Sequence, residues 1–431
     1  MSERIILVWF RNDLRIHDNE ILLEATRKAD KVLPVYCFDP YYFQNNADGT
    51  PKTGTLRARF LLESVADLRK NLQALDSELI IRIGDPAEVL PQLAAQYGVS
   101  EVYHHREVAH EETNISERVE TTLWNLRLNL KHFIGHTLYH KEDLPFPIKD
   151  IPDSFAVFKK KVERDSDVRP CLATPEIIST PEIIDAGELP TLQQLGLNEP
   201  VDDPRSSIKF TGGETAGLAR LKEYFTNNSQ VAPTKGRNGA TVDRSSKISP
   251  WIALGCISMR QVYWAVVKHE QTHNVHNTGM LELELLWRDY FRFMFKKHGK
   301  QYFTTDEQAE TTSADKQALF EKWKSGNTGI PFIDASMHKL NITGYISNFS
   351  RQMVAGYLVR DLEVDWKKGA AYFEEKLIDY SPASNWGNWA FVAGLGHDPR
   401  DNKYFNLVKQ AGELETNSEF IDKWLPSEVA V

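Results

Sequence analysis

Short apolar runs alternate with helical periodicity along the first third of the chain. The runs that predict strands lie at residues 5–10, 32–38, 79–83 and 101–105. Between the second and third runs, apolar residues from Phe60 to Leu75 recur at helical spacing, with charged residues between them. Strands that alternate with helices are typical of a parallel sheet with helices packed on its faces. We therefore predict an α/β domain over residues 1–140.

The pattern changes after residue 140. Residues 151–204 are rich in proline and acidic side chains, and their periodicity is weak apart from a short helical piece at 155–162. We interpret residues 141–205 as an interdomain connector. From Gly212 onward the chain shows only amphipathic helical patterns, for example at 215–225 and 259–269. The second domain, residues 206–431, should be all-helical.

Length and composition limit the class of protein. A chain of 431 residues is too long for one ordinary hydrophobic core, which agrees with two domains. The net charge of -9 argues against a protein that coats nucleic acid without specificity, so any DNA contact requires a local basic surface. No apolar stretch is long enough to span a membrane, and the N-terminus lacks the pattern of a signal peptide. We expect a cytoplasmic monomer with no membrane partner.

The α/β half lacks the usual signatures of a dinucleotide or metal site. Neither G-x-G-x-x-G nor G-x-x-x-x-G-K-[ST] follows its first strand. Three histidines, His104, His105 and His110, lie near several glutamates, but a His-Glu-x-x-His site would need a histidine where Asn114 stands. We therefore predict no metal, and we expect the helical half to hold any cofactor.

The turn after the first strand, residues 10–19, is unusually polar. It ends with Asp18 and Asn19, both of which are good helix N-caps. From its composition alone we expect a solvated loop that ends in a helix cap.

A hydroxyl-rich turn in the helical half is a candidate phosphate site. Arg237, Asn238 and Gly239 precede residues 243–251, which contain three serines before an apolar helix. Exposed amides, hydroxyls and a nearby arginine suit a phosphate. The alternative is a serine-rich helix cap that binds nothing.

Two further helices place chemically useful side chains on one face. Glu284, Trp287, Arg288 and Phe291 share a face at helical spacing, and a ring beside a carboxylate and a cation suits a flat ligand such as a base. Asn348, Arg351 and Gln352 project together from another helix. The alternative for both sets is a surface charge pair over core residues.

A polar, glycine-bearing segment lies between two tryptophans near the C-terminal end. Trp366 and Trp389 bracket residues 377–388, which include Asp379 and Asn385. Buried tryptophan is usually a packing residue, so these rings alone indicate no chemistry.

Taken in order, these segments resemble the photolyase and cryptochrome family across nearly the whole chain. The opening residues 7–15 resemble the start of that family. Four stretches resemble its DASH branch, at residues 34–40, 212–216, 284–293 and 396–402. The resemblance implies a Rossmann-like α/β antenna domain joined to an all-helical domain that binds FAD.

The resemblance also implies which residues bind FAD. Ser245, Ser246, Ile248 and Ser249 match a diphosphate-binding turn, with Arg237 nearby. In the positions that line the flavin, Arg351 would pair with Asp379 and Asn385 would face the reactive N5 atom. The residues implied to bind FAD are Arg237, Ser245, Ser246, Ile248, Ser249, Asn348, Arg351, Asp379 and Asn385.

The implied activity is blue-light-driven repair of cyclobutane pyrimidine dimers, preferentially in single-stranded DNA, by an electron from reduced FAD. Asn348 favours these dimers because (6-4) photolyases would be expected to carry histidine there. The implied lesion contacts are Glu284, Trp287, Arg288, Asn348 and Gln352, and the implied catalytic residues are Asn385, Trp389, Trp366 and Glu284. The alternative is a blue-light photoreceptor that uses the same flavin without repair.

Trp389 and Trp366 match the inner and middle members of a tryptophan chain that reduces the flavin. The chain departs from the family at Ser313, where the distal tryptophan would fall, at Ser381, where aspartate is usual, and at Pro233, where an aromatic ring is usual. A folate antenna, methenyltetrahydrofolate, is also implied, with Glu111 as its candidate contact.

Overall fold

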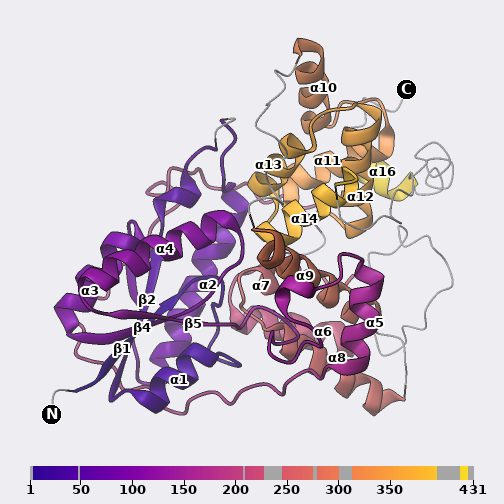
Figure 1. The fold of residues 1–431 in the computed structure, drawn as a ribbon. Coiled ribbons are helices and arrows are strands. Elements are labelled where there is room, and N and C mark those ends of the chain that lie inside the picture. Colours follow the sequence, from indigo (N-terminus) through magenta and orange to yellow (C-terminus); the bar gives the residue numbers. More distant parts are fainter. Residues whose placement is uncertain are drawn as a thin grey trace.

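The computed structural model describes residues 3–46, 49–206, 209–227, 245–274, 279–299, 313–395 and 418–425. Its N-terminal third is a five-stranded parallel sheet with strand order β3-β2-β1-β4-β5 (Figure 1). The strands are β1 (Ile5–Phe10), β2 (Lys31–Phe38), β3 (Ile80–Ile83), β4 (Val99–His105) and β5 (Asn129–Phe133). Helices α1 (Glu20–Lys28), α2 (Thr55–Gln73), α3 (Pro86–Tyr97) and α4 (His110–Asn125) connect them.

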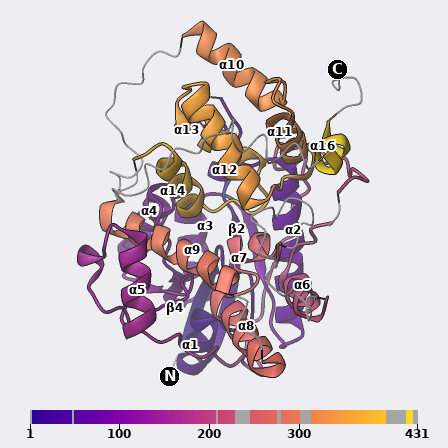
Figure 2. The same ribbon diagram turned by 90° about the vertical axis from the view of Figure 1, so that its right-hand side faces the viewer.

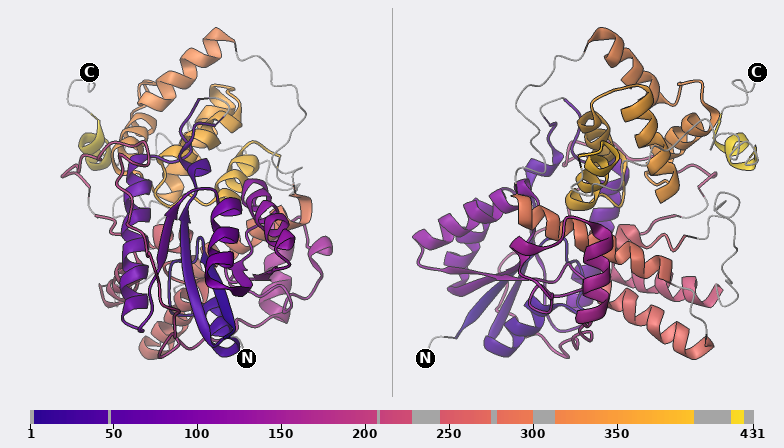
Figure 3. Two further views of the ribbon diagram at one scale, coloured as in Figure 1. Left: turned by 90° about the vertical axis from the view of Figure 1, so that its left-hand side faces the viewer. Right: turned by 45° about the vertical axis from the view of Figure 1, so that its right-hand side comes forward.

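Both faces of this sheet are covered, which explains the continuous apolar runs of its central strands. All six residues of β1 are buried. Leu7 and Trp9 belong to the core that includes α3 and α4, whereas Ile6 and Val8 belong to the core that includes α1 and α2. The helices lie on either side of the strands in the left view of Figure 3. The predicted α/β sheet and its four strands are therefore confirmed.

The edge strand β5 was not predicted. Polar and apolar residues are mixed along Asn129–Phe133, and only Leu130 and Phe133 are buried. An edge strand pairs with a neighbour on one side alone, so it does not require a continuous apolar run. Its sequence therefore gives only a weak signal for a strand.

The described chain from Glu214 onward is helical, as predicted, whereas the described residues between 166 and 213 form neither helix nor strand. The first two α-helices after the sheet are α5 (Phe155–Asp165) and α6 (Glu214–Asn227). The others are α7 (Ser249–Ala253), α8 (Met259–His273), α9 (Gly279–His298), α10 (Ala314–Ser325), α11 (Pro331–Thr343), α12 (Asn348–Gly356), α13 (Trp366–Lys376), α14 (Pro382–Val392) and α16 (Ser418–Trp424). One π-helical turn, Tyr357–Asp361, follows α12. α10 projects away from the α/β half (Figure 2).

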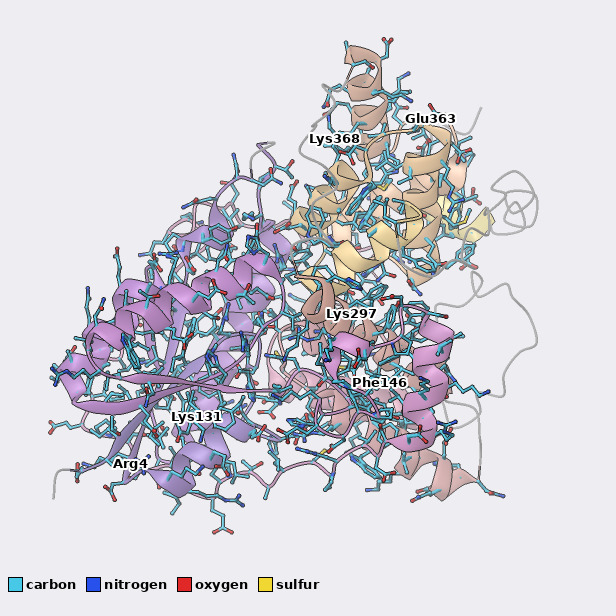
Figure 4. All side chains as sticks on the ribbon, in the orientation of Figure 1. Arg4, Lys131, Phe146, Lys297, Glu363 and Lys368 are labelled. Atoms are coloured by element: carbon cyan, nitrogen blue, oxygen red, sulfur yellow. The ribbon has the colours of Figure 1, made fainter. Side chains whose placement is uncertain are left out.

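The helical half contains two cores. The first joins α5 to α9 with the α1 and α2 face of the sheet, and the second lies among α10 to α14. α9 lies between them, and Lys297 near its end donates to the carbonyl of Ile151 at 2.7 Å and to the carboxylate of Asp153 at 2.6 Å (Figure 4). The α/β half and the helical half are thus held together by a continuous apolar core.

The segment after α5 runs back along the sheet. Backbone hydrogen bonds join Ile178 to Leu75 at 2.9 Å and Val32 to Ser179 at 2.8 Å. None of the described helices is long and apolar enough to cross a membrane.

The turn at residues 10–19 is not the solvated loop that its composition predicts. Arg11, Asp13, Arg15, Asp18 and Asn19 are all at most 8% exposed. Asn19 does cap α1, as expected, by accepting from the amide of Leu22 at 3.2 Å. Arg11 and Asp13 bond other residues of the α/β half. Arg15 and Asp18 find partners in the helical half, which a local pattern does not show.

Two contacts show how this turn joins the domains. Arg15 donates to the carbonyl of Gly255 at 2.9 Å, and Asp18 accepts from Arg260 at 2.6 Å. Gly255 has φ +62, and a Cβ atom there would lie 2.0 Å from the carbonyl oxygen of Asn12. Only glycine allows the two backbones to approach this closely.

A buried polar cluster forms a second link between the domains. Glu107, after β4, pairs with Arg292 of α9 at 2.8 Å, and both are almost fully buried. The side-chain amide of Asn12 donates to Glu107 at 3.0 Å and to Glu112 at 3.3 Å. Burial and the charge of Glu107 raise the pKa of Glu112 to about 8, whereas Arg292 helps to hold the pKa of Glu107 below its usual range. Glu107 is therefore ionised and Glu112 is protonated at neutral pH.

The two glutamates are expected to respond differently to replacement. Glu107→Gln leaves the Arg292 cation buried and unpaired, so the free energy of unfolding should fall by about 3–5 kcal/mol. Glu112→Gln replaces a neutral acid by a neutral amide and removes the proton uptake that folding requires at pH 7, so stability at pH 7 should not fall. Chemical denaturation of both variants measures the difference, and equal losses would contradict this assignment of charge.

The same pair predicts a pH dependence of stability. Since the raised pKa of Glu112 belongs to the folded state, protonated Glu112 contributes stability below its unfolded pKa of about 4.3, and this contribution is lost as the pH rises through about 8. Wild type should therefore lose stability relative to Glu112→Gln between about pH 5 and about pH 8. Denaturation at several pH values tests the trend, and parallel curves would refute it.

Candidate functional site

A cavity of about 510 Å³ opens among the helices of the C-terminal half. α7, α9, α12 and α14 supply most of its wall, together with the turn before α7 and the segment around Asp379. Figure 2 shows α9 running below α12 and α14. The predicted site residues that line it are Ser245, Ser246, Ile248, Ser249, Glu284, Trp287, Arg288, Asn348, Arg351, Gln352 and Asp379. Residues from four separate predicted patterns thus meet in one place.

An ion pair crosses the deep part of this cavity. Arg351 of α12 donates to the two carboxylate oxygens of Asp379 at 2.9 and 2.7 Å, and Ser249 of α7 donates to the same carboxylate at 2.6 Å. Burial would lower the pKa of Arg351, but the charge and hydrogen bond of Asp379 raise it above its ordinary value. A fixed cation and carboxylate therefore face any ligand here.

Asn385 lies in a second cavity of about 90 Å³, whose wall also includes Asn348, Arg351 and Asp379. Its side-chain amide donates to the carbonyl of Ala370 at 3.0 Å, and the residue is 8% exposed. That bond fixes the side chain and leaves its carbonyl oxygen as the group available to a ligand.

The hydroxyl-rich turn forms one wall of the main cavity. Residues 245–249 all line it, and Ser246 and Lys247 are buried. Lys247 has φ +53, a left-handed conformation that is uncommon outside glycine. This conformation redirects the chain into α7 and places the serines on the cavity wall.

The four residues predicted to share one face of α9 all line the cavity, but their environments differ. Glu284 is exposed at the mouth of the cavity, as are Asn348 and Gln352. Trp287 stacks on Phe155 of α5 with ring centroids 3.5 Å apart and still lines the cavity. The mouth of the cavity therefore carries polar side chains beside an aromatic ring.

Arg288 lies deeper, in the wall shared by two cavities. It lines the main cavity and also a cavity of about 100 Å³ between the α/β and helical halves. Burial lowers its pKa to about 10, so it stays charged. Its Nε atom and the Oγ atom of Ser384 are buried without a hydrogen-bond partner among the described residues, although both side chains line the main cavity. These groups are suited to a polar ligand.

The interdomain cavity lies at the carboxyl ends of β1 and β2, near the point where the strand order reverses between β1 and β4. Parallel α/β sheets bind ligands at this place. Its lining includes Arg11, Asp39, Glu112 and Arg292, while Glu111 pairs with Lys52 at 2.7 Å and is not part of the lining. Among the described residues, no group of three His, Cys, Asp or Glu side chains is arranged to hold a metal ion.

The predicted tryptophans lie in one core beside the smaller cavity. Trp389 lines that cavity and contacts Trp323, with ring centroids 6.2 Å apart, while Trp366 contacts Trp386 at 5.8 Å. Sequence reasoning missed Trp386 as a neighbour of Trp366, although it lies within the same glycine-bearing segment. Ser313, where the distal tryptophan was expected, is the N-cap of α10.

Three predictions fall on residues that the structure does not describe. Arg237 and Pro233 lie between residues 227 and 245, and the stretch at 396–402 lies after residue 395.

Comparisons with known proteins agree with this architecture. The family described as "FAD binding domain of DNA photolyase" matches residues 281–430, and the family described as "DNA photolyase" matches residues 6–177. Cryptochrome DASH of Gloeobacter violaceus is 45% identical over 99% of this chain and 86% of its own length. Cryptochrome DASH of Danio rerio is 43% identical over 99% of this chain and 84% of its own length.

Solved structures show the same fold. The cryptochrome of Synechocystis sp. PCC6803 has a TM-score of 0.92 and 41% identity, covering 99% of this chain and 90% of that one. The archaeal photolyase of Sulfolobus tokodaii, solved with two FAD molecules, has a TM-score of 0.81 and 27% identity, covering 99% of this chain and 91% of that one.

An α/β domain beside a helical domain with this polar, aromatic cavity defines a flavoprotein of the photolyase type, and its cofactor is FAD. The chain belongs to the photolyase and cryptochrome family, within its DASH cryptochrome branch.

The packing of α14 on α9 provides a test of how the cavity is built. A Cβ atom at Gly387 would lie 2.4 Å from the ring of Phe291, which lines the cavity. Gly387→Ala should therefore lower the free energy of unfolding by about 1–3 kcal/mol through overpacking. At Gly356 on α12 nothing lies within 4 Å of such an atom. Because Gly356 lines the cavity, Gly356→Ala should stabilise the helix by about 0.5–1 kcal/mol in the protein without FAD. Urea unfolding measures both, and losses of equal size would contradict the close contact.

Proposed function

We propose that this protein uses blue light to split cyclobutane pyrimidine dimers, with a preference for single-stranded DNA. The observation that carries this proposal is the mouth of the cavity, where the exposed Glu284 and Asn348 lie beside the ring of Trp287 above the buried Asp379 and Asn385. A base flipped out of the strand requires a ring to stack on and polar groups for its edge. Flipping costs less in a single strand, where no pairing is lost.

The residues present fit FAD. The serines at 245, 246 and 249, with Ile248 between them and Arg237 nearby in sequence, would hold the diphosphate. Arg351, Asp379, Asn348 and Asn385 would line the isoalloxazine ring. When bound there in its reduced form, FAD would supply the light-driven electron transfer that splits the dimer. The fixed Arg351 cation favours a negatively charged ring over a neutral one.

The protein residues at the mouth would position the lesion. Trp287 is held from behind by Phe155, so its ring is already placed before DNA arrives. Glu284 and Asn348 would bond the edges of the two pyrimidines, and Gln352 lies exposed beside them. Arg288, in the deeper wall, would add positive charge. Preformed contacts reduce the ordering needed when the lesion enters.

The tryptophans and the interdomain cavity would serve the flavin. Trp389 and Trp366 would pass electrons to the flavin and keep it reduced. A folate antenna, methenyltetrahydrofolate, would bind between the domains, in a cavity whose lining does not include Glu111. The proposed setting is the cytoplasm, with the protein acting as a monomer.

Repair of a thymine dimer in a short single-stranded oligonucleotide tests the proposal. Glu284→Ala and Asn348→Ala should abolish light-dependent splitting while flavin absorbance shows that FAD stays bound. The exposed Gln317 of α10, which bonds Glu321 and Lys368, offers a polar control position outside the cavity. Gln317→Ala should leave splitting unchanged. A flavin-loaded wild type that splits no dimer would favour a photoreceptor without repair.

Glu284 also predicts a pH dependence of lesion binding. The surrounding cavity walls desolvate its carboxylate and raise the pKa of Glu284 to about 6, although the charge of Arg351 opposes the shift. Its ionised form accepts a hydrogen bond from a pyrimidine N–H, so dimer affinity should rise about tenfold between about pH 5 and about pH 8. Glu284→Gln should remove this rise because its amide does not titrate. Fluorescence titration with a dimer-containing oligonucleotide measures it, and a falling affinity would refute the assigned role.

A further inference from the structure

Tyr380 occupies an unusual place between two cavities. It lines the smaller cavity together with Trp389 and Asn385, and it also lines the interdomain cavity. The residue is 8% exposed. A buried phenol therefore separates the flavin side of the helical half from the α/β half.

The phenol of Tyr380 has a carboxylate partner. Glu374 of α13 interacts with it by charge and by hydrogen bond, and is itself 5% exposed. Burial and the charge of Glu374 raise the pKa of Tyr380 well above its ordinary value, so the phenol keeps its proton in the dark. Burial also raises the pKa of Glu374, while Lys52 and Arg57 oppose that shift. The pair thus contains a proton donor and a nearby group that can receive the proton.

A cation lies over the ring of Tyr380. The guanidinium carbon of Arg57 is 4.7 Å from the ring centroid. A positively charged ring next to this cation is unfavourable, since like charges in a buried site repel strongly. Loss of an electron from Tyr380 is therefore favourable only together with loss of its proton, and Glu374 is the base in place to take it.

Aromatic contacts connect Tyr380 to the tryptophans. The indole nitrogen of Trp386 donates to the phenol oxygen at 3.2 Å, and the ring of Trp386 contacts Trp366 at 5.8 Å. Trp386 and Trp389 lie three residues apart on α14, a spacing that places side chains on neighbouring turns of one face. Electrons can pass from Tyr380 through these rings to the wall of the flavin cavity.

A second tyrosine, Tyr372, also connects to Trp389 through an aromatic ring, but its phenol bonds an amide rather than a carboxylate. Trp389 also contacts Trp323, which contacts Tyr372 at 5.8 Å. The phenol of Tyr372 bonds the side-chain oxygen of Asn341 at 2.6 Å, and two lysines lie near its ring, Lys324 at 5.6 Å and Lys376 at 5.4 Å. An amide oxygen is a poor proton acceptor, so Tyr372 cannot readily form a neutral radical.

We propose that Tyr380 is a redox-active tyrosine that ends the electron path for light-driven flavin reduction, with Glu374 as its proton acceptor. The inference rests on the proposed function, because it assumes that the excited flavin takes an electron from Trp389. One electron then moves from Tyr380 through the tryptophans to refill Trp389. The phenolic O–H bond breaks, its proton goes to Glu374, and a neutral tyrosyl radical remains. A thiolate in solution then supplies one electron while Glu374 returns the proton.

Electron paramagnetic resonance after blue illumination of the FAD-loaded protein tests the assignment. Wild type should give a long-lived tyrosyl signal, which ring-deuterated tyrosine should narrow. Tyr380→Phe should lose it, and Glu374→Gln should lose it because an amide cannot take the proton. Tyr372→Phe, the matched control, should keep it.

Three results would overturn the proposal: a long-lived tryptophan radical in wild type, a tyrosyl signal that survives Tyr380→Phe, or a signal lost in Tyr372→Phe. The deuteration result comes from the unaltered chain, so it holds even where a variant folds poorly. Dimer splitting by chemically reduced wild type is measured separately. Intact splitting without a tyrosyl signal counts against Tyr380 alone, whereas absent splitting counts against the repair function.

Discussion

The ion pair between Arg351 and Asp379 is the interaction on which the site depends. It joins α12 to the segment before α14, and Ser249 adds α7 to the same carboxylate. A buried guanidinium without this carboxylate would carry an uncompensated charge, so the three elements are held in one arrangement. In the proposed function, the pair would also place a positive group beside the flavin ring. The same ion pair thus holds the helices together and would set the charge beside the cofactor.

The interface between the two domains contributes to the site as much as the helices do. The polar turn after β1, the Glu107 to Arg292 pair and a continuous apolar core hold the sheet against α9. Arg288 then lies in the wall between the main cavity and the interdomain cavity, and Tyr380 lies between the smaller cavity and the interdomain cavity. A chromophore at the sheet edge would therefore lie close to the helical cavity. The packing of the two halves brings the functional regions together.

Local patterns predicted the parts of this arrangement that have local causes. Central strands were recognised because burial on both faces requires continuous apolar runs, and the faces of α9 and α12 were recognised from helical spacing. β5 was missed because an edge strand tolerates polar residues. The turn at residues 10–19 was misjudged because the partners of Arg15 and Asp18 lie about 240 residues away in sequence.

The setting of Tyr380 shows the same limit. Its partners come from α2, α13 and α14, so no sequence spacing links Arg57, Glu374 and Trp386. The family resemblance implied which residues bind the flavin but gave no role to this tyrosine. Only the three-dimensional packing brings its cation, base and aromatic neighbour together.

The most direct measurement of the central claim is the flavin content of the purified protein. Heat denaturation should release one FAD per chain with yellow fluorescence, and Asp379→Leu, which leaves Arg351 unpaired, should release far less. A wild-type protein that releases no flavin, even after reconstitution with FAD, would contradict the assignment of this cavity.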